Sequence, residues 1–430
     1  MKQFTRACIL LFVLLCACRT LRAQTSPYCT NNNRFTQNVI YTEAQIRNDT
    51  GIVYGQDTTW LGAPITLKMN IHQPKPTLDT NTKHPFIMML YGGSFTTGTR
   101  WIVDTLCIEL ARRGYVTANI DYRLGWTCSD SLSYLRAAYR AMQDLHAALR
   151  FVSANAATMR VDTAWMFAGG QSAGSGTVLG LVYTQQSEIN AVYPQLSTLL
   201  GNINKADNSL TNKFTLKGIF NNWGSVEAPF FDIADALPMV SFHGDQDGVV
   251  NIDSAQELNC FTAPPWAYGS RAIHQKIVAA GICSDLTVKL GGHHGVFTDD
   301  STDISFRAGR AACFFKMLFC NSCVSAYREV TQRDPEDTNC PQTGSRSSVG
   351  EMHGPGDNWY VYPNPASNTV TVSGVDRSKD FILTVLDATG RKILTMHNST
   401  TIDISPLSRG LYIIRLEQDG HMGIRKLVKE

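Results

Sequence analysis

The chain has 430 residues, of which 43% are hydrophobic and 17% are charged, and its formal net charge at pH 7 is +2. This composition is normal for a globular protein, and no basic stripe points to a nucleic-acid partner. Beyond the N-terminus no stretch is long and apolar enough to span a membrane as a helix, so we expect a soluble mature chain.

Residues 1–23 have the pattern of a secretory signal peptide. Lys2 and Arg6 supply positive charge, residues 7–18 form a short apolar core, and Ala23 offers a small residue for cleavage before Gln24. The apolar core is too short to be a transmembrane helix. The alternative is a lipoprotein signal, because Leu-Cys-Ala-Cys at 15–18 is an imperfect lipid-attachment box. Both interpretations predict export.

The cysteine content agrees with export. Three of the 12 cysteines lie in the predicted signal peptide, which leaves nine in the mature chain. An oxidising compartment permits disulfides, and the odd number means that at least one thiol is free or pairs with another chain. Cys320 and Cys323 form a C-x-x-C motif, but no second pair with zinc spacing follows it, so the motif favours disulfides over a metal site.

Residues 24–321 alternate strand-like and helix-like segments and are long enough for one catalytic domain. The solid apolar run at 84–90 is typical of a buried strand, whereas residues 134–153 have the spacing of an amphipathic helix. This alternation predicts an α/β fold, a mostly parallel sheet flanked by helices, with function at the carboxyl edge of the strands. The predicted strands are 63–71 (antiparallel), 84–90, 115–120, 165–168, 217–221, 239–242 and 286–290, and a further helix is predicted at 104–113.

A G-x-S-x-G motif at residues 170–174 is the most informative feature. It follows the apolar run 165–168 and precedes the small and apolar residues 175–182, so it connects a strand to a helix. In that context the motif is the nucleophile elbow of an α/β-hydrolase, where glycines leave room for a strained turn that exposes the serine. We therefore expect Ser172 to be the nucleophile. The alternative is a small-residue turn in a tightly packed α/β unit.

A serine nucleophile needs a histidine base that a carboxylate orients, and in this fold the acid and then the histidine follow the serine in the chain. The strand at 239–242 leads to Asp245 and Asp247, and the strand at 286–290 leads to His293 and His294. The His-Gly-x-x-Asp-x-x-Val and Gly-x-Gly-His-Gly patterns of this fold favour Asp247 and His294, with Asp245 as a turn residue. We expect His243 to be structural. Asp245, Asp247 and Gly248 also resemble part of a calcium-binding loop, but the rest of that motif is absent from the sequence.

Residues 90–95, Leu-Tyr-Gly-Gly-Ser-Phe, follow the buried strand at 84–90, where this fold places the loop that stabilises an oxyanion. Glycines let the backbone approach a substrate and point its N–H groups inward. We expect the amides of Gly93, Ser94 and Ala173 to be the donors. The alternative is a plain glycine turn.

Taken together, these motifs resemble those of carboxylesterases and hormone-sensitive-lipase-like esterases. Residues 91–95 are similar to the His-Gly-Gly-Gly or Tyr-Gly-Gly-Gly-Phe loop of these enzymes, and residues 114–124, 144–151 and 170–174 continue the match in order. The resemblance covers roughly residues 60–300. Ser94 departs from the commoner glycine but still offers an amide. The resemblance implies an α/β-hydrolase fold and esterase activity.

Residues 322–357 are polar and are predicted to be a linker. Residues 358–430 then alternate short strands and turns, which predicts a small Ig-like β-sandwich. The predicted strands are 369–372, 382–386, 392–396, 401–404 and 411–416.

This segment closely resembles the C-terminal sorting domain of proteins that the type IX secretion system of Bacteroidetes exports. The resemblance rests on Tyr-Pro-Asn-Pro-Ala at 362–366, the Asp-Ala-Thr-Gly turn at 387–390, residues 404–412 and the basic end at 425–429. It implies passage across the outer membrane, after which the domain is normally removed and the cargo is released or anchored. The alternative is a generic β-sandwich for carbohydrate binding.

The sequence thus predicts a secreted or cell-surface serine carboxylic-ester hydrolase that works through Ser172, His294 and Asp247 and forms an acyl-enzyme without a metal or organic cofactor. The expected partners are an ester substrate, polysaccharide-linked esters included, and the type IX secretion machinery, with no nucleic acid and no membrane span. Two alternatives are a serine exopeptidase on the same fold and a non-catalytic surface adhesin. The first usually needs a larger cap than residues 183–212 supply, and the second usually lacks the nucleophile or the base.

Overall fold

The computed structural model describes residues 26–128, 131–256, 266–333, 359–364, 366–387, 391–418 and 421–429. The predicted signal peptide, most of the predicted linker and residues 388–390 of the predicted turn lie outside these ranges. Within the described ranges, no helix has the length and apolar character needed to cross a membrane.

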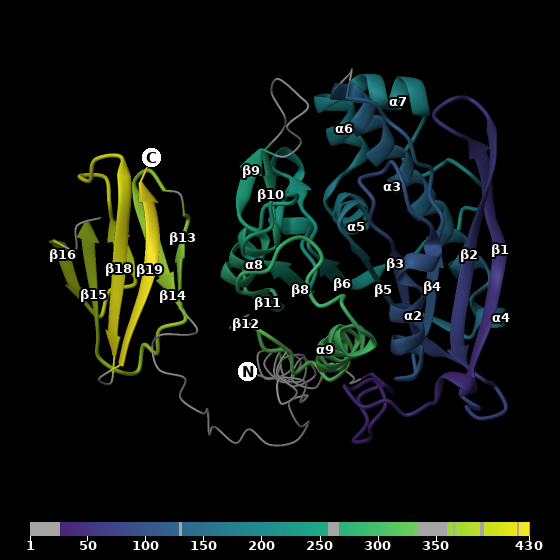
Figure 1. Cartoon of the computed structure of the whole chain (residues 1–430), viewed down its shortest axis with the longest axis horizontal. Coiled ribbons are helices and arrows are strands. Elements are labelled where there is room, and N and C mark those ends of the chain that lie inside the picture. The colour runs from purple at the N-terminus through teal and green to yellow at the C-terminus, as the bar shows by residue number, and fades with distance from the viewer. Residues whose placement is uncertain are drawn as a thin grey trace, which may run out of the picture.

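A nine-stranded sheet forms the centre of the first domain (Figure 1). β2 is antiparallel to both of its neighbours and the later pairs are parallel, as the sequence predicts for the first strand and for the rest of the sheet. The order across the sheet is β1 (Ile46–Thr58), β2 (Pro64–Pro74), β4 (Val116–Ile120), β3 (His84–Leu90), β5 (Val161–Gln171), β6 (Leu216–Asn222), β8 (Met239–Gly244), β11 (Ser284–Lys289) and β12 (Ala326–Val330).

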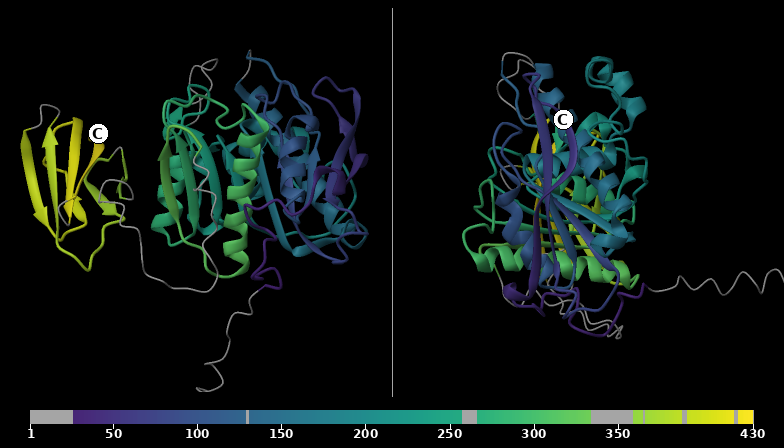
Figure 2. Two further views of the ribbon diagram at one scale, coloured as in Figure 1. Left: turned by 60° about the horizontal axis from the view of Figure 1, so that its bottom comes forward. Right: turned by 90° about the vertical axis from the view of Figure 1, so that its right-hand side faces the viewer.

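Helices cover both faces of this sheet (Figure 2). The step from β3 to β4 and the step from β4 to β5 run in opposite directions, so right-handed crossovers put their helices on opposite faces. On one face α2 (Asp104–Ala111) packs against α9 (Ser301–Phe319), and on the other α3 (Ser131–Ala154) packs against α5 (Ala173–Tyr183). Every residue of β3 is buried between these layers, which is why this strand is a continuous apolar run. The remaining α-helices of the described residues are α4 (Ala156–Met159), α6 (Gln186–Val192), α7 (Pro194–Leu200) and α8 (Ser270–Ala279).

The same reversal of direction creates a place for a site. The chain leaves β3 toward one face and β5 toward the other, so the loops that follow these two strands diverge at the carboxyl edge of the sheet. The loops after β8 and β11 end at the same edge, because these strands are parallel to β5 and β6. All the segments predicted to carry chemistry therefore start from one edge.

β12 corrects the predicted boundary of the catalytic domain. It lies inside the segment 322–357, which we expected to be a linker, yet it pairs in parallel with β11 from Ala326 to Val330. Cys323 just before it forms a disulfide with Cys283. An edge strand is short and keeps charged side chains such as Arg328, so its composition looks like that of a linker. The catalytic domain thus extends at least to Val330.

The C-x-x-C motif forms disulfides to two different segments. Cys320 pairs with Cys29, 291 residues away, and Cys323 pairs with Cys283. These bonds fasten the start of the described chain and the strand β11 to the end of α9. The preference for disulfides over a metal site at this motif is confirmed.

The second domain is built from two antiparallel sheets (yellow in Figure 1). Alternate residues such as Val370, Val372, Leu383 and Val385 are buried and form its core. The five predicted strands are confirmed, but two further strands, β13 and β19, are not predicted, because β13 is short and β19 carries charged residues. The first sheet contains β13 (Tyr360–Tyr362), β14 (Thr369–Ser373) and β17 (Thr401–Asp403), and the second contains β16 (Lys392–His397), β15 (Phe381–Asp387), β18 (Gly410–Gln418) and β19 (His421–Lys429).

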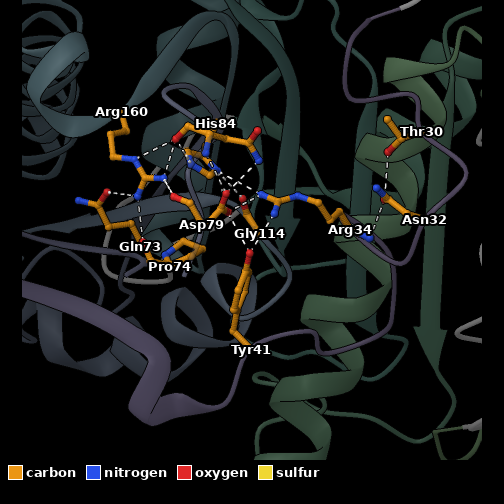
Figure 3. Close-up of polar contacts among 11 residues, drawn as sticks. Thr30, Asn32, Arg34, Tyr41, Gln73, Pro74, Asp79, His84, Gly114 and Arg160 are labelled. Carbon is orange, nitrogen blue, oxygen red and sulfur yellow. Dashed lines mark hydrogen bonds and ion pairs between the residues drawn. The ribbon is translucent and has the colours of Figure 1, made fainter. Parts of the chain in front are cut away.

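A polar network lies at the opposite, amino edge of the catalytic sheet (Figure 3). The Arg34 guanidinium donates to Asp79 Oδ2 at 2.7 Å, and the Tyr41 hydroxyl donates to the same oxygen at 3.0 Å. His84, at the start of β3, lies with its Nδ1 3.0 Å from the carbonyl oxygen of Gly114. The network ties the N-terminal segment to the sheet, so its role is structural.

Asp79→Asn is expected to lower the free energy of unfolding at pH 7 by about 3 kcal/mol, because it leaves the Arg34 charge without its partner. Burial alone would raise the pKa of Asp79, but the hydrogen bond from Arg34 and the nearby charges of His84 and Arg34 hold it below the ordinary value of 3.8. A lowered carboxyl pKa stabilises the fold above pH 4 and is lost as the pH falls further. Urea denaturation of both proteins at pH 7 and pH 3 checks this.

The matched control is Asp49→Asn, which removes a surface ion pair with Arg47 and should change the stability by less than about 0.5 kcal/mol. A difference between wild type and Asp79→Asn that stays constant from pH 7 to pH 3 would contradict the assignment.

Candidate active site

Ser172 lies at a strained turn between β5 and α5, with φ +52°. Residues other than glycine rarely adopt this region, and such strain persists only where the surroundings fix it. A Cβ at Gly170 would lie 2.3 Å from the carbonyl carbon of Gly174, and one at Gly174 would lie 2.4 Å from the carbonyl oxygen of Tyr91. Both glycines are therefore required sterically, and the turn holds Ser172 at the N-terminus of α5, where the helix dipole favours negative charge.

Three side chains from distant loops meet in series at this turn. The Ser172 Oγ is 2.8 Å from His294 Nε2, and His294 Nδ1 is 2.8 Å from Asp247 Oδ2. Since a carboxylate accepts, His294 carries its proton on Nδ1, which leaves Nε2 free to accept the hydroxyl proton of Ser172. The Asp247 carboxylate is fully buried, whereas the His294 ring is 24% exposed and open to a substrate.

Asp247 is held by four donors. Its Oδ1 accepts from the amides of Val249 and Val250 at 2.8 and 2.9 Å, and its Oδ2 lies 3.2 Å from His243 Nε2 as well as against His294. Burial would raise the pKa of Asp247, but hydrogen bonds from His243, His294 and these two amides hold it well below its ordinary value. The carboxylate thus stays ionised and fixed in place across the neutral pH range.

His243 is more closely involved than the structural role predicted for it. Its ring is buried, Nδ1 lies 2.7 Å from the Ser270 hydroxyl, and Nε2 lies 2.9 Å from the carbonyl oxygen of Val250. This pattern places the proton on Nε2, so His243 donates toward both Val250 and Asp247. His243 therefore positions the carboxylate that in turn orients His294.

The two alternatives that the sequence leaves open lie elsewhere. The His293 Nδ1 lies 3.1 Å from the carbonyl oxygen of Gln246, and this contact is exposed. The Asp245 Oδ1 is buried, and among the described residues it has no hydrogen-bond partner. Neither side chain contacts Ser172 through any hydrogen bond of the described residues. The geometry therefore brings Asp247 and His294 to the serine.

The glycine loop after β3 lies directly against the elbow. A Cβ at Gly92 would lie 3.0 Å from the Ser172 Cβ, and Gly93 has φ +122°. The loop is held by the Trp126 indole, which donates to the Ser94 carbonyl at 2.6 Å. Within the part of the chain that the structure describes, the amides of Gly93, Ser94 and Ala173 donate no backbone hydrogen bond.

Sequence reasoning missed three residues beneath and beside the site. The Asn222 carbonyl accepts the Ser172 amide at 2.9 Å, and Arg307 donates to the Asn222 side chain at 3.0 Å. The Trp223 ring lies edge-on to His294 at 6.3 Å, with the Arg307 guanidinium 5.2 Å from its centre. Burial lowers the pKa of Arg307 to about 9. The sequence signal that could have indicated Asn222 and Trp223 is the Asn-Asn-Trp run at the carboxyl end of β6.

Family models match two parts of the chain. Residues 69–232 match the family described as BD-FAE, an esterase- and lipase-like α/β-hydrolase domain, and residues 360–430 match the secretion system C-terminal sorting domain. The predicted resemblances to esterases and to a sorting domain are thereby confirmed. The sorting domain directs the chain to export through type IX secretion, to the cell surface or beyond it.

One curated relative and two solved structures are similar to parts of the chain. The neuroligin-like protein glit-1 of Caenorhabditis elegans is 31% identical over 114 residues, which are 26% of this chain and 15% of that protein. The chain thus spans a small part of this relative's length. Two solved structures are also similar. Propionate-bound esterase Est2 of the planctomycete Thermogutta terrifontis has a TM-score of 0.45 and 18% identity, and covers 66% of this chain and 97% of its own.

The second structure is a truncated carbohydrate esterase from gut microbiota, with a TM-score of 0.43 and 16% identity over 66% of this chain and 98% of its own. The family models show that the chain contains a BD-FAE domain of the esterase-like α/β-hydrolases, followed by a secretion sorting domain.

Proposed function

We propose that the catalytic domain is a serine carboxylic-ester hydrolase in which Ser172, His294 and Asp247 act as nucleophile, base and orienting acid. The observation that carries the proposal is the continuous hydrogen-bonded series from the Ser172 hydroxyl through His294 to the buried Asp247 carboxylate. A serine hydroxyl is a poor nucleophile alone, and this arrangement is the one that activates it.

The geometry supports a two-stage mechanism. Ser172 Oγ attacks the ester carbonyl while His294 Nε2 takes its proton, and the imidazolium that forms is stabilised by Asp247. The amides of Gly93, Ser94 and Ala173 stabilise the oxyanion, each donor contributing on the order of 10²–10³-fold in rate. His294 then protonates the leaving alcohol, and water releases the acid from the acyl-enzyme.

We also propose the domain organisation of the whole chain. Residues 1–23 are a signal peptide, the catalytic domain runs from residue 24 to at least Val330, and a linker connects it to the sorting domain at 358–430. The β12 pairing supports the end of the catalytic domain at or beyond Val330.

Ester hydrolysis is expected to exceed amide hydrolysis by at least about 10³-fold in kcat/KM. After the end of α5 at Tyr183, the segment up to residue 212 forms only the short helices α6 and α7, and such a small cap offers few contacts to a peptide. The measurement compares p-nitrophenyl acetate and butyrate with the p-nitroanilides of alanine and of a short peptide. Faster cleavage of the anilides would favour the exopeptidase alternative, and cleavage of neither class would favour the adhesin.

A further inference from the structure

A partly open cavity of about 90 Å³ adjoins the elbow. One water molecule needs about 10–15 Å³ of such space, so the cavity has room for a chain of several carbons. Helices α3, α5, α6 and α7 supply most of its wall, together with the residues that follow β6. The lining residues used below are Phe95, Tyr134, Gly176, Tyr193, Ser225 and Glu227.

The cavity lies on the side of the site that would receive an acyl group. Gly176, in its wall, donates its amide to the Ser172 carbonyl at 2.9 Å, and Phe95 follows the predicted oxyanion donor Ser94. None of its described lining residues belongs to the loops that carry Asp247 and His294. Because His294 must protonate the leaving alcohol, the alcohol lies toward those loops and the acyl group lies away from them.

The wall is apolar apart from a few groups, and Glu227 is the charged residue of the described lining. The carboxyl accepts a hydrogen bond from the Tyr193 hydroxyl at Oε2, at 3.1 Å. Among the described residues, Tyr193 is the hydrogen-bond partner of this carboxyl. The Glu227 side chain is half-buried in this apolar wall, so the hydroxyl of a ligand in the cavity can donate a hydrogen bond to its carboxyl oxygens.

We propose that this cavity is the acyl pocket and that Glu227 makes it selective for acyl groups that carry a hydroxyl at their far end. The inference rests on the proposed esterase function and specifies its substrate class. The apolar wall binds the carbon chain, Glu227 accepts the hydrogen bond of the terminal hydroxyl, and Tyr193 holds the carboxylate in place.

The selectivity depends on pH. Burial raises the pKa of Glu227 to about 7, against the smaller lowering by the Tyr193 hydrogen bond. The other titratable groups of the lining are the Tyr193 and Tyr134 hydroxyls. Tyr268 lies on the strand that pairs with β7 (Val226–Glu227), and the Lys276 ammonium lies 4.4 Å from the centre of its ring. Above pH 7 the ionised carboxylate is a stronger acceptor, so the preference for the hydroxylated acyl group rises with pH.

The test compares kcat/KM for methyl hexanoate and methyl 6-hydroxyhexanoate at pH 6 and pH 8.5. The wild-type enzyme should prefer the hydroxylated ester by roughly 10- to 100-fold at pH 8.5, the range for a hydrogen bond to an ionised group, and by several-fold less at pH 6. Glu227→Gln should reduce the preference to about 3-fold or less and remove its pH dependence, and Glu227→Leu should reverse it. Glu43→Gln, an exposed site, is the matched control and should behave as wild type.

For each variant, kcat/KM is compared between the two esters. A loss of folded protein lowers both values equally and cancels from their ratio. Equal rates on the two esters in wild type, or the same ratio in wild type and Glu227→Gln, would overturn the assignment of Glu227 while ester hydrolysis itself leaves the proposed function standing. A wild-type protein that hydrolyses neither ester would overturn both.

Discussion

Replacing Ser172 with alanine is expected to lower kcat for ester hydrolysis by about 10⁶-fold, because it removes the hydroxyl that His294 activates to form the acyl-enzyme. The variant keeps the strained backbone and its packing, so its thermal unfolding midpoint should stay within a few degrees of wild type. Residual hydrolysis should be first order in hydroxide, since only the oxyanion donors remain to assist water. Steady-state assays with p-nitrophenyl butyrate measure the effect.

The matched control is Ser187→Ala on α6, an exposed serine outside the site, which should leave kcat unchanged. A Ser172→Ala protein that retains more than about one per cent of the wild-type rate while folded would remove Ser172 from the role of nucleophile.

Asp247→Asn is expected to lower kcat by about 10⁴-fold. All the groups around the Asp247 carboxylate, His294 and His243 included, donate hydrogen bonds to it. In asparagine one of the two oxygens becomes an NH₂ group, which is itself a donor and cannot accept from them. The exchange therefore favours the wrong tautomer of His294, with the proton on the nitrogen that must accept from Ser172. The pH profile of kcat/KM, measured from pH 5 to 10, gives the size of the loss.

Asp245→Asn is the comparison that decides between the two acids of the loop. Asp245 lies two residues away and makes no described contact with His294, so its replacement should reduce kcat by less than about tenfold. A larger loss in Asp245→Asn than in Asp247→Asn would contradict the assignment.

The parts of the fold that follow from local pattern could be predicted from the sequence. β3 occupies the predicted residues 84–90, because a strand buried on both faces has to be apolar throughout. β12 and β19 could not be predicted, because a strand with one exposed face carries charges such as Arg328 and Lys429 and has the composition of a loop. Their place in a sheet depends on partners that are distant in sequence.

The same distinction holds for the site. Motifs of a few residues were enough to indicate Ser172, Asp247 and His294. Each of these residues lies in a turn that contains a glycine at a position with no room for a side chain. Asn222 and Arg307 support the elbow through contacts between residues 50 and 85 positions apart in the chain, and no local sequence pattern predicts such contacts. Glu227 resembles any strand glutamate until the cavity beside it is known.

The most direct test of the proposed mechanism is to locate the covalent adduct that a fluorophosphonate probe forms with the wild-type protein, by mass spectrometry of its peptides. A reactive serine at the elbow predicts a single adduct on Ser172, formed at a rate that His294→Ala lowers by at least about 10³-fold. An adduct on a different residue, or labelling of Ser172 at an equal rate without His294, would contradict it.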